Sequence, residues 1–221
     1  MRLEQGLKRH ISLKDDHPVG RINTLTMNDD ITATGIFGGS FNPIHNGHLS
    51  VATHIMAHAG LKEVWLTVSP QNPLKAQSEL IDDNTRVDMA QAAVAGIAGV
   101  SVCTVEMDMP RPSYTWLTMR TLTERYPRRR FTLLIGADNW LCFNRWRNAD
   151  ELLRRYNIIV YPRKGCNIDT ATMPTGVNYC DMPLIDVSST DIRRRIRQHL
   201  PISHLVPAAV EKIIKERRLY L

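Results

Sequence analysis

From residue 31 onward, the chain alternates between two hydrophobic periods. Short apolar runs rich in β-branched residues predict buried strands, and longer stretches with apolar positions three and four apart predict helices. A repeated order of strand and helix is typical of a parallel sheet covered by helices on both faces, a Rossmann-like, doubly wound α/β fold. The expected strands are residues 31–37, 63–69, 100–105, 131–135 and 157–161, and the expected helices are residues 47–60, 85–98 and 113–126.

The two ends of the chain differ from this pattern. Residues 1–30 are polar and show no sustained period, so we expect a mobile N-terminal arm followed by one domain over residues 31–221. Met27 stands just before the first strand, which raises the hypothesis that translation begins there. Residues 208–218 are expected to form a helix that packs on the domain or on a second subunit. The sequence therefore leaves both a monomer and a homo-oligomer as alternatives.

Charge indicates the kind of partner. A net charge of +6 suggests an anionic partner, which would be a nucleic acid, a membrane surface or a phosphorylated metabolite. Nucleic acid is disfavoured because no helix-turn-helix signal or aromatic–basic interleaving accompanies the arginine clusters. No apolar run approaches the roughly 18 residues of a spanning helix, and the four cysteines show no paired spacing. We therefore expect reduced thiols, a cytoplasmic location and no membrane partner.

The stretch GIFGGSFNPIHNGH, residues 35–48, concentrates the candidate chemistry. Gly38 and Gly39 follow the first strand at once, so the backbone there can approach a ligand closely. Neither the G-x-G-x-x-G pattern nor the P-loop pattern is present. Gly47 opens the next helix, whose free N–H groups form an anion site, and His45 and His48 are three residues apart, on one side. The pattern favours binding of phosphate oxygens.

A metal site is the alternative, because the same helix carries His54 and His58 at the spacing that zinc sites use. Helical phase places this pair on the solvent side, away from His48, so the histidines cannot share one ion. We therefore predict no protein-bound metal. The phase is counted from an expected core stripe of Leu49, Ala52, Met56 and Ala59.

A second constellation, DVSSTDIRRRI, lies at residues 186–196. Ser188 and Asp191 are spaced as a capping box, and Ile192 and Ile196 would be the buried side of the helix. Arg193 is not explained in this way, because the helix dipole disfavours a cation in the first turns unless an anion binds there too. Free N–H groups, hydroxyls and a guanidinium together suit a polyphosphate.

These two motifs resemble the signatures of the nucleotidylyltransferase superfamily, whose members transfer a nucleotidyl group from a triphosphate to a phosphate. Residues 38–48 are similar to G-x-F-x-P-x-H-x-G-H, and residues 188–193 are similar to S-S-T-x-I-R. The resemblance implies catalytic roles for His45, His48 and Arg193, and it implies ATP contacts at Gly38, Gly39, Ser40, Phe41, Ser188, Ser189 and Thr190.

Within the superfamily, the chain most resembles the nicotinate-nucleotide adenylyltransferases, through SPQNPLK, NTRVDMA, PSYT and GADNWLCFNRW. From the residues alone, Asp138 is equally suited to ribose hydroxyls and to capping the next helix. The family more often has Thr and Asp where Ser40 and Asn42 stand, and Pro-Pro-His-Lys at residues 72–75. The resemblance implies adenosine contacts at Gly136 and Asp138, acceptor-ring contacts at Tyr114 and Trp146, and contacts with the acceptor's carboxylate or phosphate at Lys75 and Arg86.

The implied reaction joins ATP and nicotinate mononucleotide into deamido-NAD and pyrophosphate, with Mg²⁺ held mainly by the phosphates. A phosphate monoester is already mostly dianionic at pH 7, which explains why the motifs contain no poised general base. Nicotinamide mononucleotide or another phosphorylated acceptor remains the alternative substrate.

Overall fold

The computed structural model describes residues 31–71 and 80–221, so the predictions for residues 1–30, Met27 and Lys75 lie outside the described residues. Most of the expected elements are present within two residues of their predicted ends. The strands are β1 (Thr32–Gly39), β2 (Glu63–Val68), β3 (Val100–Cys103), β4 (Arg129–Gly136), β5 (Asn157–Tyr161) and β6 (Val177–Tyr179). The α-helices are α1 (Asn46–His58), α2 (Asp83–Val94), α3 (Thr115–Arg125), α4 (Ala137–Trp140), α5 (Ala149–Arg155), α6 (Ser189–Arg197) and α7 (Ala208–Glu216). Short 3₁₀ helices cover Val105–Asp108, Phe143–Arg145 and Thr170–Thr172.

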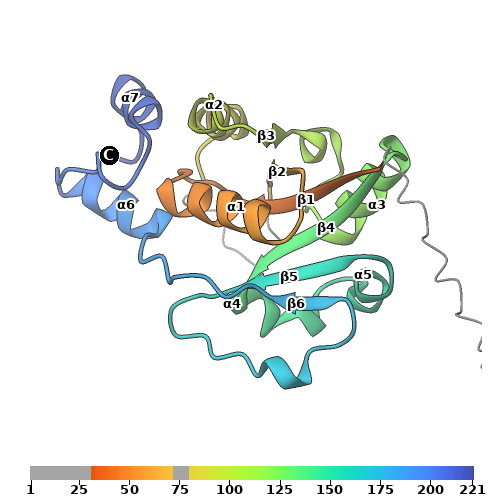
Figure 1. The fold of residues 1–221 in the computed structure, drawn as a ribbon. Coiled ribbons are helices and arrows are strands. Elements are labelled where there is room, and N and C mark those ends of the chain that lie inside the picture. The colour runs from red at the N-terminus through yellow and green to blue at the C-terminus, as the bar shows by residue number, and fades with distance from the viewer. Residues whose placement is uncertain (1–30, 72–79) are drawn as a thin grey trace, which may run out of the picture.

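Within the described residues, six parallel strands form one sheet in the order β3-β2-β1-β4-β5-β6 (Figure 1). The chain starts in the middle, extends to one edge and then returns to build the other half. The predicted doubly wound, Rossmann-like fold is therefore confirmed. The winding reverses between β1 and β4, and ligands of such sheets bind at this point, beyond the carboxyl ends of the strands.

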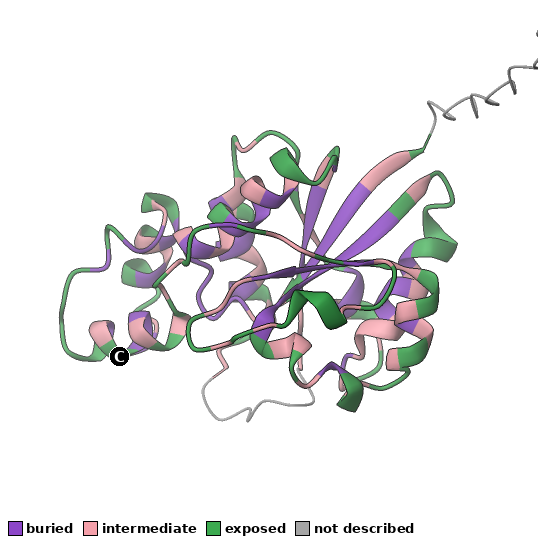
Figure 2. Ribbon diagram, turned by 60° about the horizontal axis from the view of Figure 1, so that its bottom comes forward, coloured by how far each residue is buried: buried purple, intermediate pink, exposed green. Residues whose placement is uncertain are grey.

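Each face of the sheet carries its own hydrophobic core. One core joins the sheet to α1, α2, α6 and α7, and the other joins it to α3, α4 and α5. The strands are buried along most of their length, while exposed residues gather on the outer sides of the helices (Figure 2). Because both faces are covered, the carboxyl edge of the sheet is where the backbone and polar side chains can meet a ligand.

The predicted phase of α1 needs a correction. The helix buries Val51, Ala52 and Ile55, whereas Ala59, expected in the core stripe, is exposed. Leu49 and Met56 of the predicted stripe are half-buried and pack against the same core, so the buried face extends to Val51 and Ile55. His58 is exposed, as expected, and His54 is half-buried beside it.

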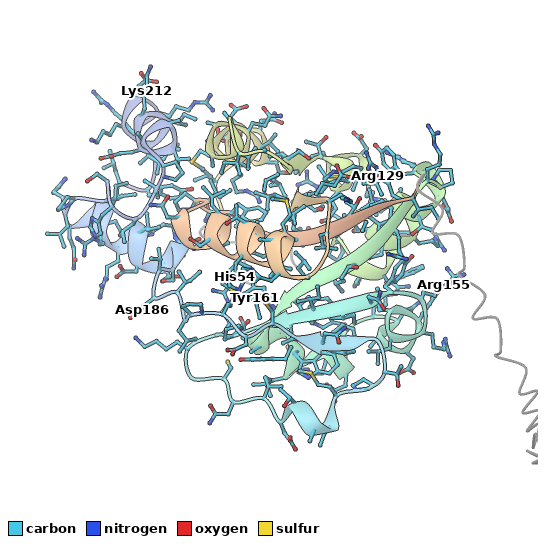
Figure 3. All side chains as sticks on the ribbon, viewed as in Figure 1. His54, Arg129, Arg155, Tyr161, Asp186 and Lys212 are labelled. Carbon is cyan, nitrogen blue, oxygen red and sulfur yellow. The ribbon has the colours of Figure 1, made fainter. Side chains whose placement is uncertain are left out.

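The C-terminal helices pack on the domain itself. In Figure 1, α6 and α7 lie beside each other, and α7 contacts α2. Lys212 on α7 and Arg155 on α5 point outward into solvent (Figure 3). No helix among the described residues is long and apolar enough to cross a membrane.

Candidate active site

Side chains pack closely against the glycines Gly39 and Gly136 at the ends of β1 and β4. A Cβ at Gly39 would lie 2.9 Å from Cζ of Phe41, and a Cβ at Gly136 would collide with Asp138 Oδ1. Gly38 has open space at the same place. The Phe41 ring is buried under the loop, and its centroid lies 4.9 Å from that of His48. The Phe41 ring therefore packs inside the loop, and the contact of Phe41 with ATP stays a prediction.

His45 and His48 are brought together at the start of α1. Their rings stack, with centroids 3.6 Å apart and planes inclined by 25°. His45 is the N-cap residue of α1, and its backbone N–H donates to His48 Nδ1 at 3.2 Å. Because Nδ1 accepts this hydrogen bond, the neutral ring of His48 carries its proton on Nε2. A Cβ at Gly47 would lie 3.0 Å from the His45 ring, which explains a glycine between the histidines.

The surroundings of His45 keep its ring neutral. The side chain is 3% exposed, and burial, assisted by the positive charge of Arg163, lowers the pKa of His45 from 6.5 to about 3. A bound polyphosphate would oppose both effects, because it brings negative charge to a site that lacks it. His45 is therefore a hydrogen-bonding group before the anion binds, and it is a candidate to take up a proton with the anion.

The pKa of His45 predicts a pH dependence of stability. Between pH 6.5 and about 3, the unfolded chain binds a proton at this histidine that the folded chain does not, so stability is complete above pH 6.5 and decreases below it. From pH 7 to pH 5, this amounts to about 2 kcal/mol. Urea unfolding should show that His45→Asn loses less stability over this interval than the wild type. The matched His58→Asn variant should follow the wild type, and equal pH slopes for all three proteins would contradict the prediction.

The second signature lies against the first. Ser189 Oγ donates to Pro43 O at 2.9 Å, and Arg193 Nη1 donates to Asn42 O at 2.9 Å. Arg193 is 8% exposed and its Nη2 also lies 3.5 Å from Thr190 Oγ1. The hydrogen bond to Asn42 is thus a structural reason for Arg193 to stand in the first turns of α6, and it does not require an anion. Arg193 therefore lies against the loop that leads to His45, as a catalytic role shared with the two histidines requires.

Only one of the two hydrogen bonds of the predicted capping box forms at the N-terminus of α6. Ser188 Oγ accepts a hydrogen bond from the Asp191 N–H at 3.1 Å, which makes Ser188 the N-cap. The Asp191 carboxylate pairs with Arg194 on the helix surface, so the predicted capping box lacks its reciprocal half. Ile192 and Ile196 are buried, as predicted.

A cavity of about 300 Å³ opens on the other face of the same strand ends. Tyr114 and Trp146 both line it, together with Gly38, Gly39 and Gly136. The Trp146 ring packs against Phe143 with centroids 5.2 Å apart, and its indole Nε1 is buried with no hydrogen-bond partner among the described residues. An indole N–H without a partner is a donor that a ligand can use. The aromatic residues predicted to share a site therefore line one cavity.

Comparison with known proteins decides the family. Residues 36–195 match the cytidylyltransferase-like family. A relative from Bacteroides fragilis named "probable nicotinate-nucleotide adenylyltransferase" is 41% identical over 186 residues, which are 84% of this chain and 92% of the relative. A relative of the same name from Porphyromonas gingivalis is 40% identical over 175 residues, covering 79% of this chain and 89% of the relative. The chain belongs to the nicotinate-nucleotide adenylyltransferase family.

A solved structure shows the same fold. The Plasmodium falciparum nicotinic acid mononucleotide adenylyltransferase complexed with NaAD has a TM-score of 0.74 to this chain, at 19% sequence identity. The match covers 86% of this chain and 97% of the other. This likeness shows the fold, and the two relatives show that this chain is a nucleotidyltransferase.

In this adenylyltransferase, Arg86 is placed differently from expectation. Its side chain is fully buried and donates to the carbonyl oxygens of Ser40 at 2.6 Å and Ser69 at 2.7 Å. It also pairs with Asp83 at 2.5 Å and donates to Ile81 O at 3.3 Å. The guanidinium is turned inward and ties the loops after β1 and β2 together. The contact between Arg86 and the acceptor stays a prediction that this geometry argues against.

The structure removes one of the two roles predicted for Asp138, the capping of the next helix. The N-cap of α4 is Gly136, and Asp138 lies inside the helix with an exposed carboxylate, so it does not cap the helix. Asp138 Oδ1 lies 3.7 Å from Nε of Arg163. Ribose binding therefore stays as the prediction for Asp138.

Two candidate residues were not found from the sequence. Arg163 stands two residues after the end of β5. Its guanidinium carbon lies 5.3 Å from the centroid of the Tyr161 ring, a cation–π contact, and the side chain lines a small crevice with His45 and His48. Glu106 lines the cavity of Tyr114, and burial raises the pKa of its carboxyl group, opposed by the Thr118 hydroxyl. A basic residue just past the end of a parallel strand was the available signal for Arg163, and Glu106 gave none.

The donors at this site suit phosphates better than a metal ion. Among the described residues, no group of three or more His, Cys, Asp or Glu side chains is placed to hold a metal. His54 and His58 stack on each other with centroids 4.1 Å apart, and His58 Nδ1 lies 2.8 Å from His54 O. Imidazole, guanidinium and backbone N–H groups at the strand ends are instead suited to phosphate oxygens.

Proposed function

We propose that this protein transfers the adenylyl group of ATP to nicotinate mononucleotide, giving deamido-NAD and pyrophosphate. The observation that carries the proposal is the pairing of two sites across one sheet edge. A cavity lined by Tyr114 and Trp146 lies on one side, the stacked His45 and His48 lie on the other, and Tyr161 borders both. A flat ring with a phosphate and a triphosphate can then meet at the end of β1.

In the proposed reaction, a phosphate oxygen of the acceptor attacks the α-phosphorus of ATP. A new P–O bond forms, the bond from the α-phosphorus to the bridging oxygen breaks, and pyrophosphate leaves. The attacking phosphate is already ionised at pH 7, so no residue needs to remove a proton. Catalysis consists of holding two anions in line and stabilising charge on the transferring and leaving phosphates.

Different residues around the triphosphate would supply hydrogen-bond donors and positive charge. His48 donates from Nε2, His45 and the N-terminus of α1 add further donors, and Arg163 adds a positive charge. We propose that Ser188, Ser189 and Thr190 bind the triphosphate from α6, with Arg193 holding the loop and facing the same anion. Ser40 with Gly38 and Gly39 would contact ATP, and Gly136 with Asp138 would contact the adenosine.

A divalent cation accompanies the triphosphate in nucleotidyltransferases, and we propose Mg²⁺. The described residues fit this role only indirectly, since they supply donors for phosphate oxygens and no carboxylate cluster. The ion would therefore be held by the phosphates, where it would neutralise charge on the leaving pyrophosphate. We propose no nucleic-acid or membrane partner, and a homo-oligomer remains open.

The function is tested by measuring pyrophosphate release from ATP with nicotinate mononucleotide and nicotinamide mononucleotide side by side. We expect release with the nicotinate acceptor, a higher kcat/KM for it than for the amide, and deamido-NAD as product. Release with the amide alone would correct the acceptor, and no release with either would refute the proposed reaction. The magnesium dependence follows from the same assay after chelation.

Replacement of Trp146 by alanine tests the acceptor cavity. The side chain lines that cavity and not the crevice of the histidines, so the KM of the acceptor should rise about tenfold or more while kcat falls less. Steady-state kinetics with the acceptor varied at saturating ATP measure both constants. Trp140→Ala is the matched control, because Trp140 also packs against Phe143, with centroids 5.2 Å apart, but does not line the cavity. A loss of stability without a change in KM would assign Trp146 to the core alone.

A further inference from the structure

The last residues of the chain contact the signature loop, residues 40–45, which joins β1 to α1. Tyr220, one residue from the C-terminus, is 9% exposed, and its hydroxyl donates to Asn42 Oδ1 at 2.9 Å in a buried hydrogen bond. The two residues are 178 positions apart in the sequence. Figure 1 shows the C-terminus beside α6 and α7. A residue near the end of the chain thus contacts the loop that leads to His45 and His48.

Asn42 is the point where several parts of the protein meet. Its side-chain oxygen also lies 3.5 Å from the Ile81 N–H, and its backbone oxygen accepts the hydrogen bond from Arg193. Pro43, the next residue, accepts from Ser189. His45, three residues after Asn42, is the N-cap of α1, and its N–H donates to the His48 ring. A shift at Asn42 would therefore move both histidines.

The tail that carries Tyr220 is itself anchored. Arg217 donates to Thr85 Oγ1 at 3.0 Å and pairs with Asp88 at 2.7 Å, both on α2. Arg218 and Tyr220 adopt φ angles of 49° and 66°, the left-handed region that residues with a Cβ adopt only when their contacts hold them there. These turns direct the phenol ring inward. Burial raises the pKa of Tyr220, so the hydroxyl keeps its proton and remains a donor.

We propose that Tyr220 is a positioning residue for adenylyl transfer, which acts through Asn42 to hold the signature loop in the conformation that aims His45 and His48 at the triphosphate. This inference rests on the proposed function, since it assumes that these histidines bind the triphosphate. Tyr220, Asn42 and the two histidines do not line the acceptor cavity, so the role of Tyr220 should appear in turnover and not in acceptor affinity.

The test compares Tyr220→Phe with the wild type in the pyrophosphate-release assay. The substitution keeps the ring and removes only the donor. We expect kcat to fall about tenfold with the acceptor KM within about twofold, at a temperature where both proteins are folded. Tyr156→Phe is the matched control, because it removes a hydroxyl that contacts Thr123 on the surface, far from the loop. It should retain wild-type constants.

A double-mutant cycle with Asn42→Ala separates positioning from a general loss of stability. If Tyr220 acts through Asn42, the double variant should be no slower than Asn42→Ala alone. Additive losses, an unchanged kcat in Tyr220→Phe, or equal changes in kcat and KM would each overturn the inference. If the wild type itself released no pyrophosphate, the proposed function would fail instead, so the two failures are distinguishable.

Discussion

Replacing His48 by alanine should lower kcat about 100-fold or more while the KM of the acceptor changes little. The ring holds its proton on Nε2 because Nδ1 accepts the His45 N–H, so it presents one fixed donor at the start of α1. Removal of a single donor aimed at transition-state charge costs about 10²–10³ in kcat. Steady-state kinetics with each substrate varied in turn measure the effect.

The alanine variant also removes the acceptor for the His45 N–H, so a second variant is needed. His48→Asn supplies a side-chain oxygen in the position of Nδ1 and lacks the distal donor. We expect it to be as slow as the alanine variant but closer to the wild type in thermal stability. His54→Ala, on the same helix, is the control for helix packing. Near wild-type kcat in folded His48→Asn would remove His48 from the catalytic group.

The fold was predictable where hydrophobic period and length agreed. Strands β1, β2, β4 and β5 contain short apolar runs that are buried, which are typical of a parallel sheet. The elements that were missed, β6 and α5 among them, have 3 and 7 residues, too short to show a period. The phase error in α1 has a related cause, because apolar residues nearly surround that helix and only the sheet decides which of them are buried.

The site was predictable as a set of motifs but not as a set of contacts. The resemblance implied that the two motifs act on one ATP, and in the structure Ser189 and Arg193 of α6 donate to the loop before α1. Whether an arginine faces a ligand or the interior depends on carbonyl oxygens from distant loops, which no local pattern records. Arg86 and Arg193 both donate to such oxygens. The hydrogen bond from Tyr220 to Asn42 likewise joins residues far apart in the sequence, so no local pattern predicts it.

Arg86→Met should lower the free energy of unfolding by about 3 kcal/mol or more, because it removes a buried charge that satisfies several groups at once. Methionine fills similar space, but the carbonyl oxygens of Ser40 and Ser69 lose their donor. These oxygens belong to the loops after β1 and β2, which border the acceptor cavity. Urea unfolding should show a lower midpoint with an unchanged slope, which identifies a change in stability.

Arg111→Met is the control for the charge on Asp83. Arg111 pairs with the same carboxylate at 2.6 Å, but it is 53% exposed, so its loss should cost less than about 1 kcal/mol. The difference between the losses of unfolding free energy in the two variants then measures what Arg86 contributes by its hydrogen bonds to the loops after β1 and β2. If Arg86→Met kept wild-type stability and instead raised the acceptor KM, the guanidinium would face the acceptor after all. Burial and five hydrogen bonds to its own protein argue for the structural outcome.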